Sequence, residues 1–147
     1  MNSTSVKLKI LFLCTGNACR SQMAEGWARA LKGDLIQPYS AGIEKHGLDP
    51  MAVAVMKEAG VDISRQQSKT VEELGPLKFN VVVTVCADAD GKCPALGGAP
   101  RVVHVGFDDP PRMSRGAATQ QEAMGHYRRV RDQIQAFVRT LPRGLDA

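Results

Sequence analysis

The strongest constraint on this chain is a short run near its start. An apolar stretch over residues 10–13 leads directly into Cys14 of a Cys-x5-Arg-Ser loop, and a helical pattern follows from residue 21. In a loop of this form the backbone N–H groups point inward, and the following helix adds the positive end of its dipole. The run therefore predicts a strand, a loop that cradles a tetrahedral oxyanion, and a helix, in that order.

The side chains of the loop support this prediction. Arg20 offers a planar fork of donors to two anion oxygens, and the same positive field would hold Cys14 as a nucleophilic thiolate. Gly16 and Asn17 tolerate a positive φ. Ser21 is expected to cap the helix and to donate its hydroxyl to Cys14, or to act as a cap alone. The expected oxyanion-binding residues are Thr15, Gly16, Asn17, Ala18, Cys19, Arg20 and Ser21.

Composition narrows the class of protein. The chain has 147 residues, of which 44% are hydrophobic and 23% charged, as in an ordinary globular protein. We expect one domain over residues 1–147. No signal peptide or membrane-length apolar run is present, so we expect a cytoplasmic protein without membrane contact. The net charge of +4 comes without interleaved aromatic residues, which favours a small anion over nucleic acid as ligand.

The four cysteines suggest chemistry rather than structural disulfides in such a compartment. Their spacings, Cys14-x4-Cys19 and Cys86-x6-Cys93, differ from the Cys-x2-Cys spacing of zinc sites. The three histidines, at 46, 104 and 126, are interpreted as surface or packing residues. We therefore expect no metal and no bound cofactor. Cys19 is expected to be a small, partly buried space-filler.

Predicted strands and helices alternate along the chain. Asp49 is expected to cap a helix that begins at Pro50. The apolar runs at 79–85 and 101–105 are typical of parallel strands buried on both faces. This alternation predicts a doubly wound α/β fold with a parallel four-stranded sheet and helices on both faces. The expected strands are 7–13, 35–40, 79–85 and 101–105, and the expected helices are 21–32, 50–58, 70–74 and 119–140.

Two further loops follow strands and should meet the Cys14 loop at the carboxyl edge of the sheet. The first is polar and carries Cys86 and Cys93, which are either two unrelated cysteines or a pair that can bridge after rearrangement. The second contains Asp109 before two prolines. This carboxylate either caps a turn or serves as a general acid for a leaving oxygen.

The Cys-x5-Arg-Ser loop after the first strand, with a late Asp-Pro loop, resembles the low-molecular-weight protein tyrosine phosphatases. The segment from Cys14 through Gly26 and the Cys86/Cys93 pair resemble the thioredoxin-coupled arsenate reductases within that fold. The resemblance runs from about residue 9 to residue 137. Pro111 stands where the phosphatases usually carry a tyrosine, which favours the reductases.

This resemblance implies a mechanism. Arsenate would lie between loop N–H groups and Arg20, Cys14 would attack arsenic, and Asp109 would protonate the departing hydroxyl. Cys86 would then attack Cys14 and release arsenite, and Cys93 would attack Cys86. Thioredoxin would reduce the resulting disulfide, and we expect the protein to act as a monomer. Two alternatives stay open: a low-molecular-weight tyrosine phosphatase, which needs neither Cys86 nor Cys93, and an oxyanion-binding redox sensor.

The resemblance also marks one departure. Some members of the family bind potassium through residues matching Asn17, Glu25 and Ser40, together with an aspartate whose position Lys69 occupies here. Lys69 is expected either to replace the cation by pairing with Glu25 or to be a solvated surface lysine.

Overall fold

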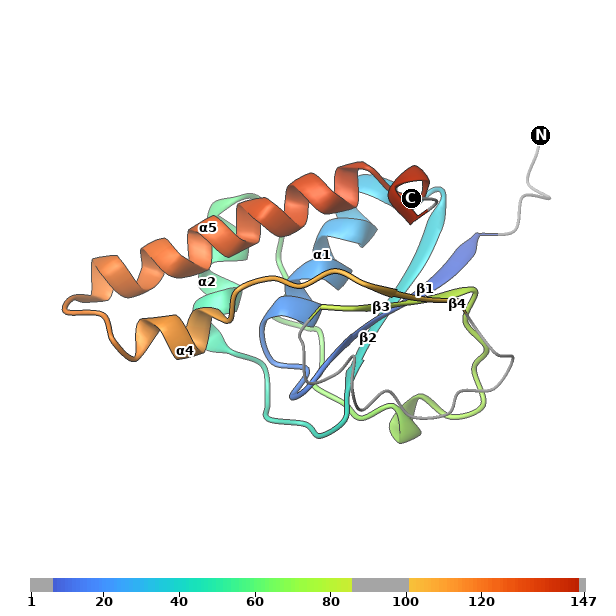
Figure 1. Cartoon of the computed structure of the whole chain (residues 1–147), viewed down its shortest axis with the longest axis horizontal. Helices are drawn as coiled ribbons and strands as arrows, with labels where there is room; N and C mark the ends of the chain where they lie inside the picture. Colours follow the sequence, from blue (N-terminus) through green and yellow to red (C-terminus); the bar gives the residue numbers. More distant parts are fainter. Residues whose placement is uncertain (1–6, 86–100, 146–147) are drawn as a thin grey trace.

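The fold is a four-stranded sheet with every pairing parallel, seen in a computed structural model that describes residues 7–85 and 101–145 (Figure 1). The loop with Cys86 and Cys93 lies outside these residues. The strand order is β2-β1-β3-β4, so β1 and β3 are central. The strands are β1 (Leu8–Cys14), β2 (Ile36–Gly42), β3 (Val81–Thr84) and β4 (Arg101–His104). The predicted parallel α/β fold is confirmed.

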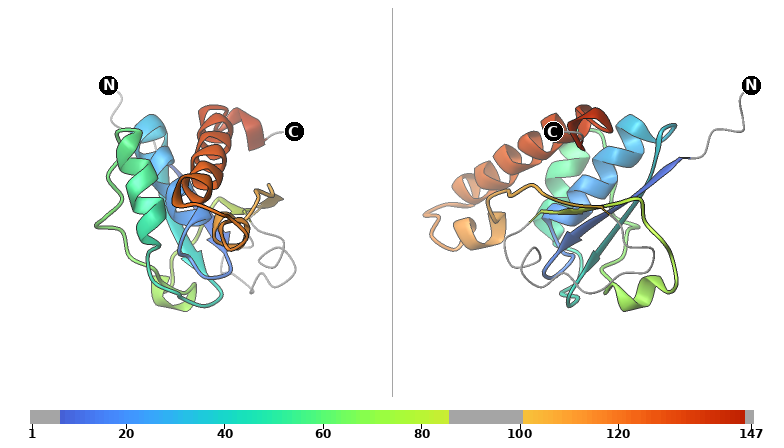
Figure 2. Two further views of the ribbon diagram at one scale, coloured as in Figure 1. Left: turned by 90° about the vertical axis from the view of Figure 1, so that its left-hand side faces the viewer. Right: turned by 45° about the vertical axis from the view of Figure 1, so that its right-hand side comes forward.

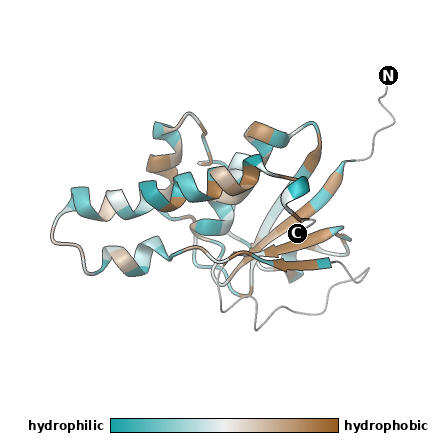
Figure 3. Ribbon diagram, turned by 45° about the horizontal axis from the view of Figure 1, so that its top comes forward, coloured by the Kyte–Doolittle hydropathy of each residue, from teal (hydrophilic) through white to brown (hydrophobic). Residues whose placement is uncertain are grey.

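The two central strands form the middle of the core, because each has a sheet neighbour on both sides. Residues 10–13 of β1 have no exposed surface, and all of β3 is buried. Both strands are coloured as hydrophobic in Figure 3. Burial of the run at 101–105 is a wrong prediction: β4 is an edge strand, and Val102 is 48% exposed. An apolar run does not reveal whether its strand lies at the centre or at the edge of a sheet.

The long helices share one face of the sheet (Figures 1 and 2). Helices α1 (Arg20–Lys32), α2 (Pro50–Glu58) and α5 (Gln120–Arg139) contact one another there. The short helix η1 (Glu72–Leu74) lies on the other side, so the helices are distributed unevenly between the two faces. The remaining helices are α4 (Pro110–Ser114), which packs against α5, and η2 (Arg143–Leu145).

Capping residues set the helix boundaries close to the predicted ones. The Asp49 side chain accepts a hydrogen bond from the backbone N–H of Met51, with Pro50 at the first helical position of α2. Thr119 caps α5 by accepting from the N–H of Glu122. Helix α5 buries one stripe of side chains: Tyr127, Val130, Ile134 and Val138. Helix α5 is thereby held against α1 and α2, and α4 packs against α5 in turn.

Candidate active site

A pocket of about 400 Å³ opens where β1 ends. It brings together the predicted nucleophile, the predicted oxyanion-binding arginine and the predicted acid, although the acid lies far along the chain. The lining residues are Cys14, Thr15, Gly16, Ala18, Cys19, Arg20, His46, Asp109, Pro111 and Arg115. The prediction that the Cys14 loop and the Asp109 loop meet at one edge of the sheet is therefore confirmed.

The backbone of the loop is oriented by hydrogen bonds to its carbonyl oxygens. Five consecutive carbonyls accept from groups behind the loop: Cys14 O from Ile43 N (3.3 Å), Thr15 O from Glu44 N (2.9 Å), Gly16 O from His46 N (2.9 Å), Asn17 O from Gln22 Nε2 (3.0 Å) and Ala18 O from Asp49 N (3.0 Å). Because these carbonyls are turned outward, the opposite side of the peptide groups is directed towards the pocket. This is the orientation that an anion cradle requires.

Asn17 is the buried pivot of the loop. Its φ is +49°, as predicted for a tight concave turn. Its Oδ1 accepts from the backbone N–H of Lys69 at 2.9 Å, and its Nδ2 donates to Ser21 Oγ at 2.9 Å. The side chain thus ties the loop to both the start of α1 and the segment before η1.

Gly16 is required for a different reason from the predicted one. It is absent from the positive-φ residues in the described part of the chain. A Cβ at this position would instead lie 2.3 Å from Nδ1 of His46. A side chain at residue 16 would therefore force the His46 imidazole to move from the position it holds against the loop.

The predicted cap of α1 by Ser21 is wrong, because the helix begins one residue earlier. Cys19 holds the N-cap position and makes no side-chain capping bond. Ser21 lies inside the first turn, fully buried, and accepts the hydrogen bond from Asn17. Its hydroxyl therefore supports the loop from behind.

Arg20 lines the pocket and contacts the last of the predicted loops. Its Nη1 donates to the backbone oxygen of Phe107 at 2.9 Å, and its Nη2 lies 3.7 Å from Oδ1 of Asp109. Its Nε is buried and has no hydrogen-bond partner within residues 7–85 and 101–145. A buried donor without a partner is costly. An oxyanion oxygen in the pocket would supply the missing acceptor.

Asp109 occupies the N-cap position of α4, but its side chain makes no capping hydrogen bond. The interpretation of this carboxylate as a turn cap is thus wrong. Pro110 at the first helical position has no N–H that would need a cap. The carboxylate instead lines the pocket next to Arg20.

The second cysteine of the loop, Cys19, lies in surroundings that disfavour its thiolate. Cys14 and Cys19 are both buried and neither is in a disulfide. Burial raises the pKa of the Cys19 thiol well above its usual range, and the charges of Asp49 and Asp109 raise it further, against an opposing contribution from Arg20. Cys19 is therefore held as a neutral thiol, in agreement with its predicted role as a space-filler.

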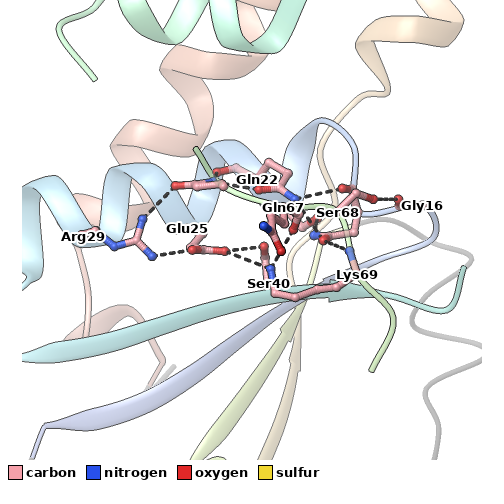
Figure 4. Close-up of polar contacts among 11 residues, drawn as sticks. Gly16, Gln22, Glu25, Arg29, Ser40, Gln67, Ser68 and Lys69 are labelled. Carbon is pink, nitrogen blue, oxygen red and sulfur yellow. Dashed lines mark hydrogen bonds and ion pairs between the residues drawn. The ribbon is translucent and has the colours of Figure 1, made fainter. Parts of the chain in front are cut away.

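A network of charged side chains supports the loop from behind (Figure 4). The buried Glu25 carboxylate pairs with Arg29 and accepts from Ser40 Oγ at 2.5 Å. Lys69 Nζ lies 3.9 Å from Glu25 and donates to Gln67 O at 2.8 Å. Burial lowers the pKa of Lys69, and Glu25 opposes that shift. Lys69 thus faces Glu25, and its interpretation as a solvated surface lysine is wrong.

Three residues of the pocket were not predicted from the sequence as site residues. His46 follows the carboxyl end of β2, and its Nε2 lies 2.6 Å from Glu44 Oε2. Pro111 and Arg115 belong to α4 and the position just after it. The one available signal was topological: loops that follow parallel strands converge at one edge of the sheet.

Across residues 7–85 and 101–145, no three His, Cys, Asp or Glu side chains are grouped so that they could hold a metal ion. In the same part of the chain no helix has the length and apolar character needed to cross a membrane.

Comparison with known proteins identifies the fold family. The family model for low molecular weight phosphotyrosine protein phosphatase matches residues 9–147. The arsenate reductase of Bacillus subtilis strain 168 is 50% identical over 125 residues, which are 85% of this chain and 88% of that protein. The arsenate reductase of Halalkalibacterium halodurans is 48% identical over 134 residues, which are 91% and 94% of the two chains.

A solved structure of an arsenate reductase has the same fold as this chain. The arsenate reductase from Archaeoglobus fulgidus superposes with a TM-score of 0.70 at 30% identity, over 90% of this chain and 97% of that one. With the family model and these relatives together, the chain belongs to the low molecular weight phosphotyrosine protein phosphatase family, among its arsenate reductases.

Proposed function

We propose that this protein reduces arsenate to arsenite by a relay of three cysteine thiols. The observation that carries the proposal is the convergence of Cys14, Arg20 and Asp109 on one pocket, in a chain about half identical to an arsenate reductase. The unpartnered Nε of Arg20 and the outward-turned carbonyls of the loop provide a place for a tetrahedral oxyanion.

The first step forms a covalent adduct. The Cys14 thiolate attacks arsenic, a bond from sulfur to arsenic forms, and one hydroxyl leaves as water with a proton from Asp109. Arg20 and the loop N–H groups stabilise the charge on the remaining oxygens.

The second and third steps move electrons between sulfur atoms. The Cys86 thiolate attacks the Cys14 sulfur, so that the electron pair of the sulfur–arsenic bond passes to arsenic and arsenite leaves. Cys93 then attacks Cys86 and returns Cys14 to the thiolate form. The resulting Cys86–Cys93 disulfide is reduced by a dithiol protein of the thioredoxin type. Cys86 and Cys93 lie outside the described residues, so their roles rest on their spacing in the sequence and on the family.

We further propose that the whole chain acts as one domain and as a monomer in the cytoplasm, where reduced thiols and a thioredoxin system are available. The reaction requires no resident metal or organic cofactor, because the thiols themselves supply both electrons.

The test is consumption of NADPH in the presence of arsenate, thioredoxin and thioredoxin reductase. Steady, arsenate-dependent turnover is expected. Its absence, combined with hydrolysis of an aryl phosphate that is equal in the wild type and in a Cys86→Ser/Cys93→Ser double variant, would establish the tyrosine phosphatase alternative instead. Oxidation of the protein without turnover would establish the redox sensor.

Single variants should stop the relay at different points. Cys14→Ser forms no adduct and no disulfide. Cys86→Ser binds and attacks arsenate but releases no arsenite. Cys93→Ser releases one arsenite per enzyme and traps Cys14–Cys86. Peptide mapping of the oxidised forms by mass spectrometry distinguishes these states, and multiple turnover by Cys93→Ser would remove Cys93 from the mechanism.

A further inference from the structure

Asp49 joins three parts of the molecule at the rear of the oxyanion loop. Its backbone N–H donates to Ala18 O at 3.0 Å, which anchors the end of the loop. Its Oδ1 accepts from Met51 N at 3.0 Å and caps α2. Its Oδ2 accepts from the hydroxyl of Tyr127, on α5, at 2.6 Å. All of the polar groups of Asp49 named here are thus committed to fixed partners.

The Tyr127 hydroxyl is buried and needs a hydrogen-bond acceptor. Its side chain is 3% exposed, and burial together with the hydrogen bond to Asp49 raises the pKa of the phenol. A buried hydroxyl needs an acceptor, and a carboxylate is a strong one. The hydrogen bond from Tyr127 therefore holds the Asp49 carboxylate, with its charge, next to the loop. An uncharged acceptor could accept the same hydrogen bond, so Tyr127 alone does not require a charge at residue 49.

The charge acts on Cys19 rather than on a substrate. Burial is the largest cause that raises the pKa of the Cys19 thiol. Among the charges, Asp49 and Asp109 disfavour the thiolate further, and Arg20 favours it. The Tyr127 hydroxyl is neutral and faces the same cluster. Asp49 offsets the positive field that Arg20 and the start of α1 provide for the whole loop.

We propose that Asp49 is a positioning residue: held by Tyr127, it fixes the Ala18–Cys19 end of the loop and keeps Cys19 an unreactive thiol, so that Cys14 alone supplies a thiolate. A cysteine nucleophile beside a second loop cysteine otherwise faces a competitor in the same positive field. The inference rests on the proposed function in one respect only, namely that Cys14 is the thiolate that attacks arsenic.

The test is the rate at which iodoacetamide alkylates Cys19 in the intact protein, followed from pH 7 to pH 10. Trypsin releases both loop cysteines in the peptide from Ile10 to Arg20, and fragmentation in the mass spectrometer separates them. Asp49→Asn keeps the helix cap and the size of the side chain but removes the charge. We expect its Cys19 profile to move to lower pH, with alkylation about fivefold faster or more at pH 8.5.

Two controls decide between charge and packing. Asp62→Asn makes the same change at an exposed aspartate whose Oδ1 also accepts from the N–H two residues on, and it should leave the Cys19 profile unchanged. Tyr127→Phe removes the hydroxyl but leaves the charge, so its Cys19 rate should stay within about twofold of wild type. Tyr39→Phe, at the exposed Tyr39 hydroxyl that accepts from Gln37, is its matched control.

The outcomes are decisive in each arm. An unshifted Cys19 profile in Asp49→Asn overturns the proposal, as does a uniform acceleration at every pH, which would indicate a loosened loop. Equal acceleration in Tyr127→Phe and Asp49→Asn would assign the protection of Cys19 to packing. Because alkylation needs no arsenate, failure here is separate from failure of the reductase assay.

Discussion

Nη2 of Arg20 lies 3.7 Å from Oδ1 of Asp109, so the arginine of the first loop faces the carboxylate of the last loop across the pocket. The distance is longer than a good hydrogen bond, and the guanidinium keeps Nε without a partner in the described part of the chain. An oxyanion that enters can therefore bind Arg20 without first breaking a tight ion pair.

Arg20→Lys should lower kcat/KM for arsenate by about a hundredfold or more. The ammonium of lysine cannot bind Phe107 O and an anion with the geometry of the planar fork. Steady-state kinetics at constant ionic strength measure the effect. Arg112→Lys, at an exposed position of α4, is the control and should retain wild-type kinetics. A loss below tenfold in Arg20→Lys would mean that the fork is not used.

Asp109→Asn should lower kcat by a factor of about 10² to 10⁴, because the amide cannot give a proton to the departing hydroxyl. The KM for arsenate should not rise, since a negative charge beside Arg20 has been removed. Asp108→Asn is the matched control, because that neighbouring carboxylate is exposed and pairs with Arg129 at 3.4 Å. An unchanged kcat in Asp109→Asn would assign the acid role elsewhere.

Lys69→Met should destabilise the fold by about 1 kcal/mol, because Glu25 then keeps one cationic partner instead of two. Urea unfolding measures this change. Lys45→Met, which breaks an exposed ion pair to Glu73, should lower the free energy of unfolding by less.

Potassium should affect the rate and stability of the wild type no more than sodium at equal concentration. A specific potassium effect would show that Lys69 does not fill the role of the cation.

The ion pairs of Glu58 should make part of the stability depend on acid pH. Hydrogen bonds from Arg128, and then from Arg131, lower the pKa of Glu58 from 4.5 to about 2. A carboxyl whose folded pKa is depressed contributes stability above its unfolded pKa and loses that contribution as pH falls through the folded value. The difference in Tm between wild type and Glu58→Gln should therefore be full at pH 6 and vanish near pH 2. A difference independent of pH would contradict this assignment.

The local pattern of the sequence predicted much of this molecule. The Cys14 loop, the positive φ of Asn17, the Asp49 cap and the helix α5 all follow from residues close together in the chain. Gly16 was predicted to be needed, but for its freedom of φ. Its actual constraint is the His46 ring, which only the folded chain brings within reach.

What the sequence could not provide were the contacts between distant segments. The residues around Lys69 do not indicate that its backbone N–H would hold Asn17, and only the family resemblance suggested that its ammonium would face Glu25. The apolar run at 101–105 looks as central as that at 79–85, yet only the strand order shows that β4 lies at an edge. Register and strand order are set by the whole sheet, and no single run encodes them.

The outward-turned carbonyls of the Cys14 loop have a consequence for selectivity. Their partners come from residues 43–49 and from α1, so the loop is held in place before any ion arrives, and we expect it to act as a preorganised cage for a tetrahedral oxyanion. A rigid cage of this kind recognises shape and charge, and phosphate matches arsenate in both. Discrimination between the two must then reside in reactivity, since thiols can reduce arsenic(V) to arsenic(III) by two electrons, whereas they do not reduce phosphorus(V).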